Sequence, residues 1–179
     1  MPTLILLRHA KSSWDDSVPR DFDRPLNPRG HRAARTMGQW AAREGLAFDR
    51  LVASPAVRVR ETLAGFAGGY GAMPEPQWEQ RAYLASSVTL LDLVREHGGT
   101  GADTLLLAGH NPGLEDLVLD LVPDSAEGLR AEVEVKYPTA AIAVLDCPAA
   151  CWADVDTGSA ALTRFVRPRD LDPALGPDE

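Results

Sequence analysis

The sequence predicts an α/β fold built on a mostly parallel β-sheet. Three short apolar runs, at 4–7, 51–53 and 104–108, are each followed by polar residues and then by a segment with helical spacing of apolar side chains. Short β-leaning segments without helical patterns between them follow after residue 138. Strands that alternate with helices, with further strands at the end, are typical of a parallel sheet covered by helices.

Length and composition are those of an ordinary globular protein. The chain has 179 residues, of which 45% are hydrophobic and 25% are charged, so it can bury a core without disulfide or metal support. We therefore predict one domain over residues 1–179, with residues 170–179 as its tail. The 18 basic and 26 acidic residues give a formal net charge of −8. This charge argues against a general nucleic-acid-binding protein but allows a local positive pocket.

The first expected elements are a strand, a long polar loop and a helix. The apolar run at 4–7 is uninterrupted, which is typical of a strand buried on both faces. The loop at 11–26 is long enough to have a functional role. Asn27 is a good helix N-cap and Pro28 suits the first helical position, and Gly45 is expected to end that helix.

A similar pattern follows the second apolar run, at 51–53. Ser54 and Pro55 repeat the cap-plus-proline signature and are expected to start a second helix, whose apolar side chains fall on one stripe. Gly68-Gly69 and Gly71 are expected to end it, because glycines weaken a helix.

Two further units complete the alternating pattern. Residues 86–97 are expected to form a helix, and residues 104–108 a buried strand. Asn111-Pro112 then repeats the cap-plus-proline signature in front of another helix. Near the C-terminus, turn residues separate three expected strands, at 140–145, 151–155 and 160–166.

The cysteine and hydropathy patterns indicate a reduced, cytoplasmic protein. Cys147 and Cys151 are too few for a disulfide scaffold, and no further Cys or His is close enough in sequence to complete a metal site. The N-terminal apolar run is too short for a secretory signal, and no stretch approaches the roughly 20 apolar residues of a membrane helix. We therefore expect reduced thiols, no metal and no membrane partner.

Histidines and arginines follow the ends of the predicted strands. Arg8 and His9 end the first strand, Arg58 lies one turn into the helix after the second, and His110-Asn111 follows the third. Ligands of parallel sheets bind outside the carboxyl ends of the strands, so these side chains can converge. Arginine pairs with phosphate oxygens, helix N-termini attract anions, and imidazole can attack phosphorus. The combination therefore favours a phosphoryl-group site.

Each of these residues alone also has an ordinary structural explanation. Arg8-His9 by itself is more often a surface pair at a strand end, and a lone Arg58 is usually on a solvated helix face. His31 and His97 are expected on the surface. Only the combination of several such residues favours chemistry over structure.

Other features of the sequence leave alternatives open. Residues 11–14 either line the mouth of the pocket or form a polar loop packed by Trp14. Arg24 and Arg29 are cations of an acidic protein, which favours surface ion pairs. The glycines at 65–71 do not form a phosphate loop, because they follow a helix and lack the Lys-Ser/Thr end of that motif.

Four motifs also stand in a fixed order and spacing: Leu7-Arg8-His9-Ala10, Arg24-Pro25-Leu26-Asn27-Pro28-Arg29-Gly30, Ser54-Pro55-Ala56-Val57-Arg58 with Thr62, and Gly109-His110-Asn111-Pro112. This arrangement resembles the histidine phosphatase superfamily. The stretches RHAKSSW (8–14) and HNPGLE (110–115) are most similar to its SixA-type phosphohistidine phosphatase branch. The resemblance covers roughly residues 3 to 170.

The resemblance implies a three-layer fold and a covalent phosphohistidine intermediate on His9. Arg8, Arg58 and His110 would complete the phosphate pocket and stabilise the transferring phosphoryl group, and Asn111 would contribute to substrate binding. Such a site works by positioning and charge stabilisation and needs neither a metal nor another cofactor.

Two departures from the family pattern concern the nucleophile loop and the proton donor. Ala10 stands where the family often has glycine, so this position is expected to avoid a positive φ. No acidic residue matches the family's proton donor; Glu75, Glu79 and Tyr83 lie nearest that point of the chain, and none is assigned. Because imidazole leaves without an acid more readily than an alkoxide does, this absence favours phosphohistidine as substrate.

The sequence therefore predicts a metal-independent phosphatase that acts through His9, on phosphohistidine in proteins. A phosphatase of small phosphorylated metabolites, a mutase and a non-catalytic phosphate-binding module are the alternatives. The expected partner is a phosphorylated protein or a small phosphorylated substrate, and neither nucleic acid nor membrane.

Overall fold

A six-stranded sheet forms the centre of the protein in the computed structural model, which describes residues 1–14, 18, 20–124 and 128–176. Its strands lie in the order β3 (Gln77–Trp78), β2 (Arg50–Ala53), β4 (Thr104–Gly109), β1 (Thr3–Arg8), β5 (Ile142–Asp146) and β6 (Ala161–Val166). The pairs β3·β2, β2·β4 and β4·β1 are parallel, and β5 pairs antiparallel with both β1 and β6. The predicted, mostly parallel sheet is thus confirmed.

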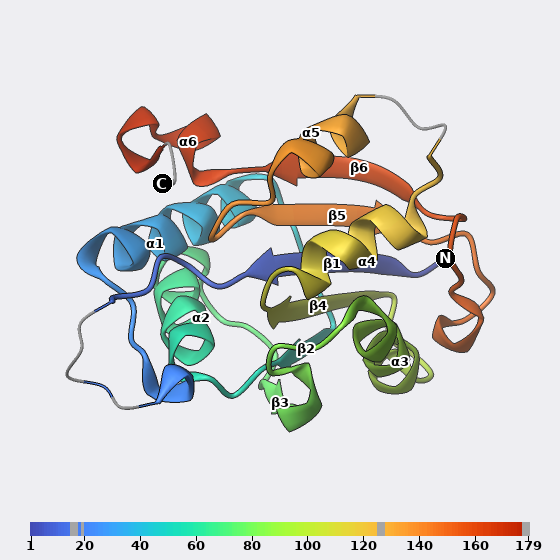
Figure 1. Ribbon diagram of the computed structural model, residues 1–179. Helices are drawn as coiled ribbons and strands as arrows, with labels where there is room; N and C mark the ends of the chain where they lie inside the picture. The colour runs from blue at the N-terminus through green and yellow to red at the C-terminus, as the bar shows by residue number, and fades with distance from the viewer. Residues whose placement is uncertain (15–17, 19, 125–127, 177–179) are drawn as a thin grey trace.

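Helices cover both faces of this sheet, as expected for a three-layer α/β fold (Figure 1). One face packs against α1 (Pro28–Arg43), α2 (Val57–Tyr70) and the short α6 (Pro168–Leu171), and the other against α3 (Ser87–Gly98), α4 (Gly113–Leu121) and α5 (Leu129–Val135). Strand β1 serves both layers: Ile5 and Leu7 face the first, Leu4 and Leu6 the second, and all four are fully buried. This explains why its apolar run has no polar gap.

The first predicted helix begins as its sequence indicates. The Asn27 side chain accepts a hydrogen bond from the Gly30 N–H at 2.8 Å, with Pro28 at the first helical position. The loop before it contains an isolated bridge between Ser12 and Leu26 and a 3-10 turn, η1 (Asp21–Asp23). Residues 15–17 and 19 of the predicted loop lie outside the described residues.

The other two cap-plus-proline predictions are wrong in detail. Helix α2 begins two residues after Pro55, and α4 begins after Pro112, with Pro112 itself at the N-cap position. Neither Ser54 nor Asn111 stands at the N-cap position of its helix. Ser54 Oγ contacts the His110 ring and also accepts from the Ala56 N–H. Asn111 Oδ1 accepts from the Glu115 N–H, so it still caps the first turn of α4, from one position before the N-cap.

Helix α2 passes through Gly68-Gly69, where a break was expected, and ends at Tyr70 with the third expected glycine, Gly71, as its C-cap residue. These glycines permit close packing of α1 against α2. A Cβ on Gly69 would lie 2.3 Å from the Arg35 carbonyl oxygen, and one on Gly38 of α1 would lie 2.1 Å from the Phe66 carbonyl oxygen. Interhelical packing therefore offsets the low helix propensity of glycine.

Three elements of the structure, η3 (Trp152–Asp154), α5 and β3, differ from the sequence prediction. Residues 151–155 form the 3-10 turn η3 rather than a strand, because the buried Trp152 donates its Nε1–H to the Ala102 carbonyl at 2.8 Å. Helix α5 and strand β3 were not predicted. Within the expected tail 170–179, residues 170–171 belong to α6 and residues 173–175 to η4 (Pro173–Leu175), and Leu175 is buried; residues 177–179 lie outside the described residues.

Replacement of Gly38 tests the contact between α1 and α2. We expect Gly38→Ala to lower the free energy of unfolding by about 1–3 kcal/mol, because the added methyl group meets backbone rather than a movable side chain. The matched control is Gly68→Ala on α2, where a Cβ meets only the end of the Arg35 side chain. That variant should be neutral or up to about 1 kcal/mol more stable. Urea unfolding measures both, and equal stabilities would contradict this packing account.

Candidate active site

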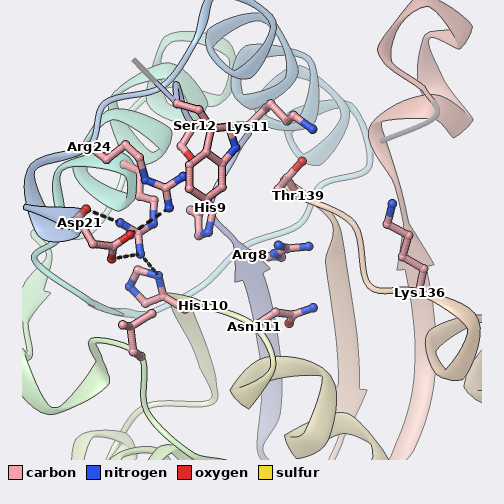
Figure 2. Close-up of a pocket in the computed structure, with 13 residues that line it drawn as sticks. Arg8, His9, Lys11, Ser12, Asp21, Arg24, His110, Asn111, Lys136 and Thr139 are labelled. Carbon is pink, nitrogen blue, oxygen red and sulfur yellow. Dashed lines mark hydrogen bonds and ion pairs between the residues drawn. The ribbon is translucent and has the colours of Figure 1, made fainter. Parts of the chain in front are cut away.

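A pocket of about 370 Å³ opens at the carboxyl ends of the central strands β1 and β4 (Figure 2). All five residues predicted to form a site line it, namely Arg8, His9, Arg58, His110 and Asn111. Eight further residues complete the lining: Lys11, Ser12, Trp14, Asp21, Arg24, Leu84, Lys136 and Thr139. Parallel pairing of β1 with β4, in which Arg8 stands opposite Gly109, brings the two strand ends together.

The His9 ring is held by its own loop. Its Nδ1 lies 2.7 Å from the Ala10 carbonyl oxygen, which can only accept a hydrogen bond. Nδ1 therefore carries the proton, and Nε2 keeps a lone pair. The Ala10 N–H donates to Thr62 Oγ1 at 2.9 Å, and that hydroxyl donates to the Arg58 carbonyl at 2.6 Å, which fixes the loop. Ala10 has no positive φ, as expected.

Burial keeps His9 uncharged. It lowers the pKa of His9 well below 6.5, and the nearby cations Arg8 and Arg58 lower it further, although the Ala10 carbonyl opposes them. At neutral pH the ring is therefore a neutral imidazole with a free Nε2, which is the form able to attack phosphorus.

His110 is neutral for the same reasons. Its Nδ1 lies 3.2 Å from Arg58 Nη2, and because a guanidinium can only donate, this nitrogen accepts. Its Nε2–H then donates to Ser54 Oγ at 2.8 Å. Burial, followed by the charge of Arg58, lowers the pKa of His110 to about 3. The His9 and His110 rings lie 5.4 Å apart, so two uncharged imidazoles face one pocket.

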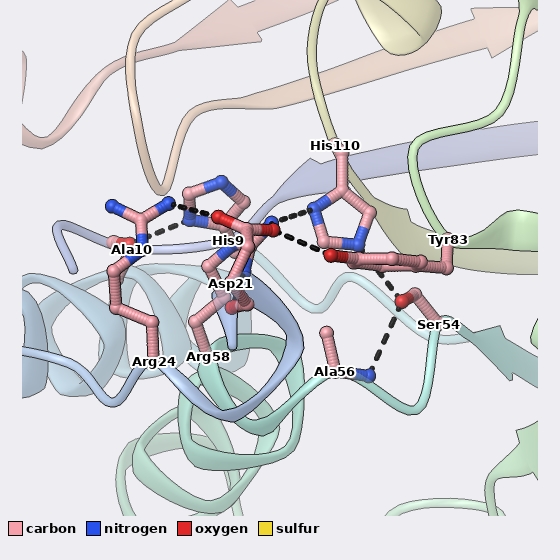
Figure 3. A network of polar contacts seen from close by, with 9 residues as sticks. All are labelled: His9, Ala10, Asp21, Arg24, Ser54, Ala56, Arg58, Tyr83 and His110. Atoms are coloured by element: carbon pink, nitrogen blue, oxygen red, sulfur yellow. Dashed lines mark hydrogen bonds and ion pairs between the residues drawn. The ribbon is translucent and has the colours of Figure 1, made fainter. Parts of the chain in front are cut away.

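Arg58 is the most buried cation of the site, with an exposed fraction of 2%. Its Nη1 donates to the Asp21 backbone carbonyl at 2.8 Å, and its Nη2 donates to Asp21 Oδ2 at 3.0 Å (Figure 3). Both contacts come from η1, so the turn clamps the guanidinium from the loop side. Asp21 is not among the site residues predicted from the sequence; its place among the acidic residues of the loop at 11–26 was the available signal.

Arg24 belongs to the pocket as well, contrary to the surface ion pair expected for it. Its Nη2 donates to Asp21 Oδ1 at 3.1 Å, and its guanidinium carbon lies 3.9 Å from the centre of the Trp14 ring. Among the described residues, Arg24 Nε and Nη1 and Arg58 Nε are buried without a hydrogen-bond partner. Buried donors of this kind fit an oxyanion ligand.

Arg8 and Asn111 are joined through one backbone group. Arg8 Nη1 and Asn111 Nδ2 donate to the Tyr137 carbonyl, at 2.8 and 3.1 Å. The buried Tyr137 hydroxyl donates to the Leu6 carbonyl at 2.6 Å, which anchors this segment to the sheet. Asn111 thus has a structural role, and its part in substrate binding stays a prediction.

The carboxylates near the family's proton-donor position lie outside the pocket lining. Glu79 contacts Arg81 and His97, and the hydrogen bonds from Arg81, the strongest influence, lower its pKa to about 2. Tyr83 does reach the site, since its hydroxyl donates to Asp21 Oδ2 at 2.5 Å. His97, expected on the surface, is half-buried between Gln77 and Glu79, whereas His31 is exposed.

The pocket is locally positive in an acidic protein. Three arginines line it, balanced in the described part of the chain by one carboxylate, that of Asp21. No group of three or more His, Cys, Asp or Glu side chains within the described residues could hold a metal ion. The arrangement can bind a phosphoryl group by its arginines and present a nucleophilic imidazole to it.

Comparisons with known proteins agree with this chemistry. A family model described as the histidine phosphatase superfamily (branch 1) matches residues 4–82. An uncharacterized protein of Mycobacterium tuberculosis is 37% identical over 165 residues, which span 91% of this chain and 100% of the relative. A proposed phosphohistidine phosphatase SixA from Nakamurella multipartitia has a TM-score of 0.76 at 32% identity, over 93% of this chain and 96% of that one. Another from Agrobacterium tumefaciens has a TM-score of 0.78 at 28% identity, over 93% and 99%.

The low pKa of His110 makes stability depend on pH. Below about pH 6.5, the unfolded chain binds a proton at this residue that the folded chain does not, until pH falls to about 3. Across this window stability falls as pH drops, by up to about 1.4 kcal/mol per pH unit from this group. We expect His110→Gln to reduce that slope in urea unfolding followed from about pH 7 to about pH 5. The exposed His31 supplies the control, His31→Gln, which should keep the wild-type slope; an unchanged slope in His110→Gln would show that the ring is not neutral when buried.

Proposed function

The chain belongs to the histidine phosphatase superfamily, within its SixA-type branch, and we propose that it is a metal-independent phosphatase working through a phosphohistidine intermediate on His9. Histidine-phosphatase-type hydrolysis of a phosphorylated substrate follows from that membership. Within it, we propose phosphohistidine in a protein as the substrate.

The observation that supports this mechanism most directly is the hydrogen bond from His9 Nδ1 to Ala10. It leaves Nε2 free to attack phosphorus while the bond to the leaving group breaks and its electron pair departs with that group. Arg8, Arg24 and Arg58 are close enough to the pocket to stabilise the charge on the transferring oxygens. Since phosphoryl transfer depends mainly on positioning and charge stabilisation, no metal is required.

The protonation state of the pocket carboxylate favours phosphohistidine over alkyl phosphates as the substrate. The Tyr83 hydroxyl, followed by Arg58 and Arg24, holds the pKa of the Asp21 carboxyl below its usual value, so this group is ionised at neutral pH and is not a proton donor. An imidazole leaving group has a pKa near neutrality and leaves without such a donor.

The pocket mouth also suits a side chain of a larger molecule. Trp14 and Leu84 line the pocket with exposed fractions of 78% and 55%, so apolar surface surrounds the entrance. A phosphorylated side chain could enter while its own protein contacts this rim. The described residues include no helix long and apolar enough to cross a membrane. The cytoplasmic location stays a prediction from the sequence.

Replacing the nucleophile tests the intermediate. We expect His9→Ala to fold normally and to lose phosphate release, because the residue follows strand β1 and belongs to neither apolar core cluster. Wild-type protein mixed with substrate in EDTA and quenched in alkali, which preserves phosphohistidine, should gain the mass of one phosphoryl group, located on His9. Release of phosphate by the folded variant, or dependence of the wild type on added Mg²⁺ or Zn²⁺, would contradict the mechanism.

The missing proton donor predicts a graded substrate preference. The leaving groups of phosphohistidine and p-nitrophenyl phosphate have a pKa of about 7. The alcohol leaving group of an alkyl phosphate has a pKa near that of water, about 16. Each pKa unit felt fully at the transition state costs about tenfold in rate, so kcat/KM should fall by several orders of magnitude toward alkyl phosphates.

The same panel separates the rival functions. Uniform kcat/KM across leaving groups, with chemistry rate-limiting, would indicate an unrecognised acid and favour a phosphatase of small metabolites. Transfer of the phosphoryl group to a second position of the substrate would indicate a mutase, and binding without turnover a non-catalytic module.

A further inference from the structure

Asp21 is the carboxylate of the active-site pocket. Among the described residues that line the cavity, it alone carries a carboxyl group. It opens the turn η1, and its side chain is 45% exposed, so the carboxylate reaches open space while it contacts the arginines. Figure 2 shows it on the wall of the cavity next to Arg24 and His110.

Both carboxylate oxygens are held in place by donors of the site. Oδ1 accepts from Arg24, and Oδ2 accepts from Arg58 and from the Tyr83 hydroxyl. These contacts come from three segments of the chain and leave little freedom to the side chain (Figure 3). Since two of the three donors are guanidinium groups of the pocket, a phosphoryl group bound there lies beside Asp21.

The ring nitrogens of the two pocket histidines are already engaged, whereas a carboxylate has about four acceptor sites, of which the donors to Asp21 named above occupy three. Once phosphorylated, His9 has its Nε2 bonded to phosphorus and its Nδ1–H directed to Ala10. His110 accepts from Arg58 at Nδ1 and donates to Ser54 at Nε2. Neither ring can take a proton from an attacking water without first breaking a hydrogen bond.

We propose that Asp21 is the general base that activates water for hydrolysis of the phosphorylated His9, an inference that rests on the proposed function. Water oxygen bonds to phosphorus as one of its protons passes to Asp21. The bond from phosphorus to His9 Nε2 breaks, and its electron pair returns to Nε2. The products are inorganic phosphate, neutral His9 and a protonated Asp21, which then releases its proton to solvent.

The charges around Asp21 suit a base that acts in the second half-reaction, the hydrolysis of phosphorylated His9. Asp21 is ionised in the free protein, so it cannot protonate the first leaving group, and an imidazole leaving group does not require it. After transfer, the negative phosphoryl oxygens lie near the carboxylate, and repulsion between like charges raises its affinity for a proton. The same residue is therefore a poor acid in the first half-reaction and a better base in the second.

Pre-steady-state kinetics of Asp21→Asn tests this role. With p-nitrophenyl phosphate, the variant should release a burst of one nitrophenol per active site at close to the wild-type rate, and then turn over at least about 100-fold more slowly. Intact mass should show phosphorylated His9 accumulating in the steady state. The matched control is Asp23→Asn, which changes a carboxylate of the same turn that is paired with Arg20 and lies outside the pocket lining; it should behave as wild type.

Chemical rescue separates a base from a positioning residue. Hydroxylamine attacks phosphorus before it loses a proton, so it should restore turnover of Asp21→Asn without accelerating the wild type to the same degree. If both half-reactions slow equally and no phosphorylated protein accumulates, Asp21 only positions Arg24 and Arg58, and the inference is wrong.

A second variant keeps the test valid if Asp21→Asn does not fold. The groups that face Asp21 are Arg24, Arg58, His110 and Tyr83, and Tyr83→Phe removes the strongest influence on its pKa. The acid limb of the hydrolysis rate should then move to higher pH, because the carboxyl group is protonated more easily. An unmoved limb would overturn the inference. Absence of any phosphorylated wild-type protein would instead refute the proposed function on which it rests.

Discussion

Three guanidinium groups surround two imidazole rings in this pocket, and the imidazoles nevertheless stay uncharged. Burial makes protonation of either ring costly, and the neighbouring cations add to that cost. The carbonyl of Ala10 fixes the tautomer of His9, and the guanidinium of Arg58 fixes that of His110. In this site the arginines carry the positive charge and the imidazoles stay neutral. The mechanism depends on this difference, because a protonated imidazole could not attack phosphorus.

The fold buries the two imidazoles, which is what keeps them neutral beside the charged arginines. Strand β1 lies between β4 and β5 in the sheet, with helices on both faces, so the residue after its last position is enclosed on several sides. Parallel pairing of β1 with β4 then places His110 near His9, although the two are far apart in sequence. Thr62 of α2 ties the nucleophile loop to the backbone of Arg58. Position of the nucleophile and position of its cation are thereby linked.

Asp21 offsets the charge that the pocket concentrates. Arg58 is almost fully buried, and a buried cation without a counter-ion would be strongly destabilising. The carboxylate contacts both Arg58 and Arg24 and still leaves three buried nitrogens of these two guanidinium groups without a partner among the described residues. Asp21 therefore reduces the cost of burying Arg58, while donors remain for a phosphoryl group. A carboxylate placed for this electrostatic reason is also the group best placed to accept a proton from water.

The sequence by itself did not determine β3, α5 or the turn η3, but it did determine the alternation of the larger strands and helices, the cap of α1 at Asn27, and the convergence of Arg8, His9, Arg58 and His110. These depend on apolar periodicity, on short-range capping and on a rule about strand ends, all of which act locally or through the sheet order. Tertiary structure decided the further contacts of Ser54, Asn111 and the glycines of α2, because their partners His110, Tyr137 and α1 are distant in sequence. It also brought Asp21 and Arg24 into the site. The bond from Arg58 to Asp21 joins residues 37 positions apart, and that from His110 to Ser54 spans 56. No local pattern records contacts of that range, since they exist only when the strand ends and the loop are folded together.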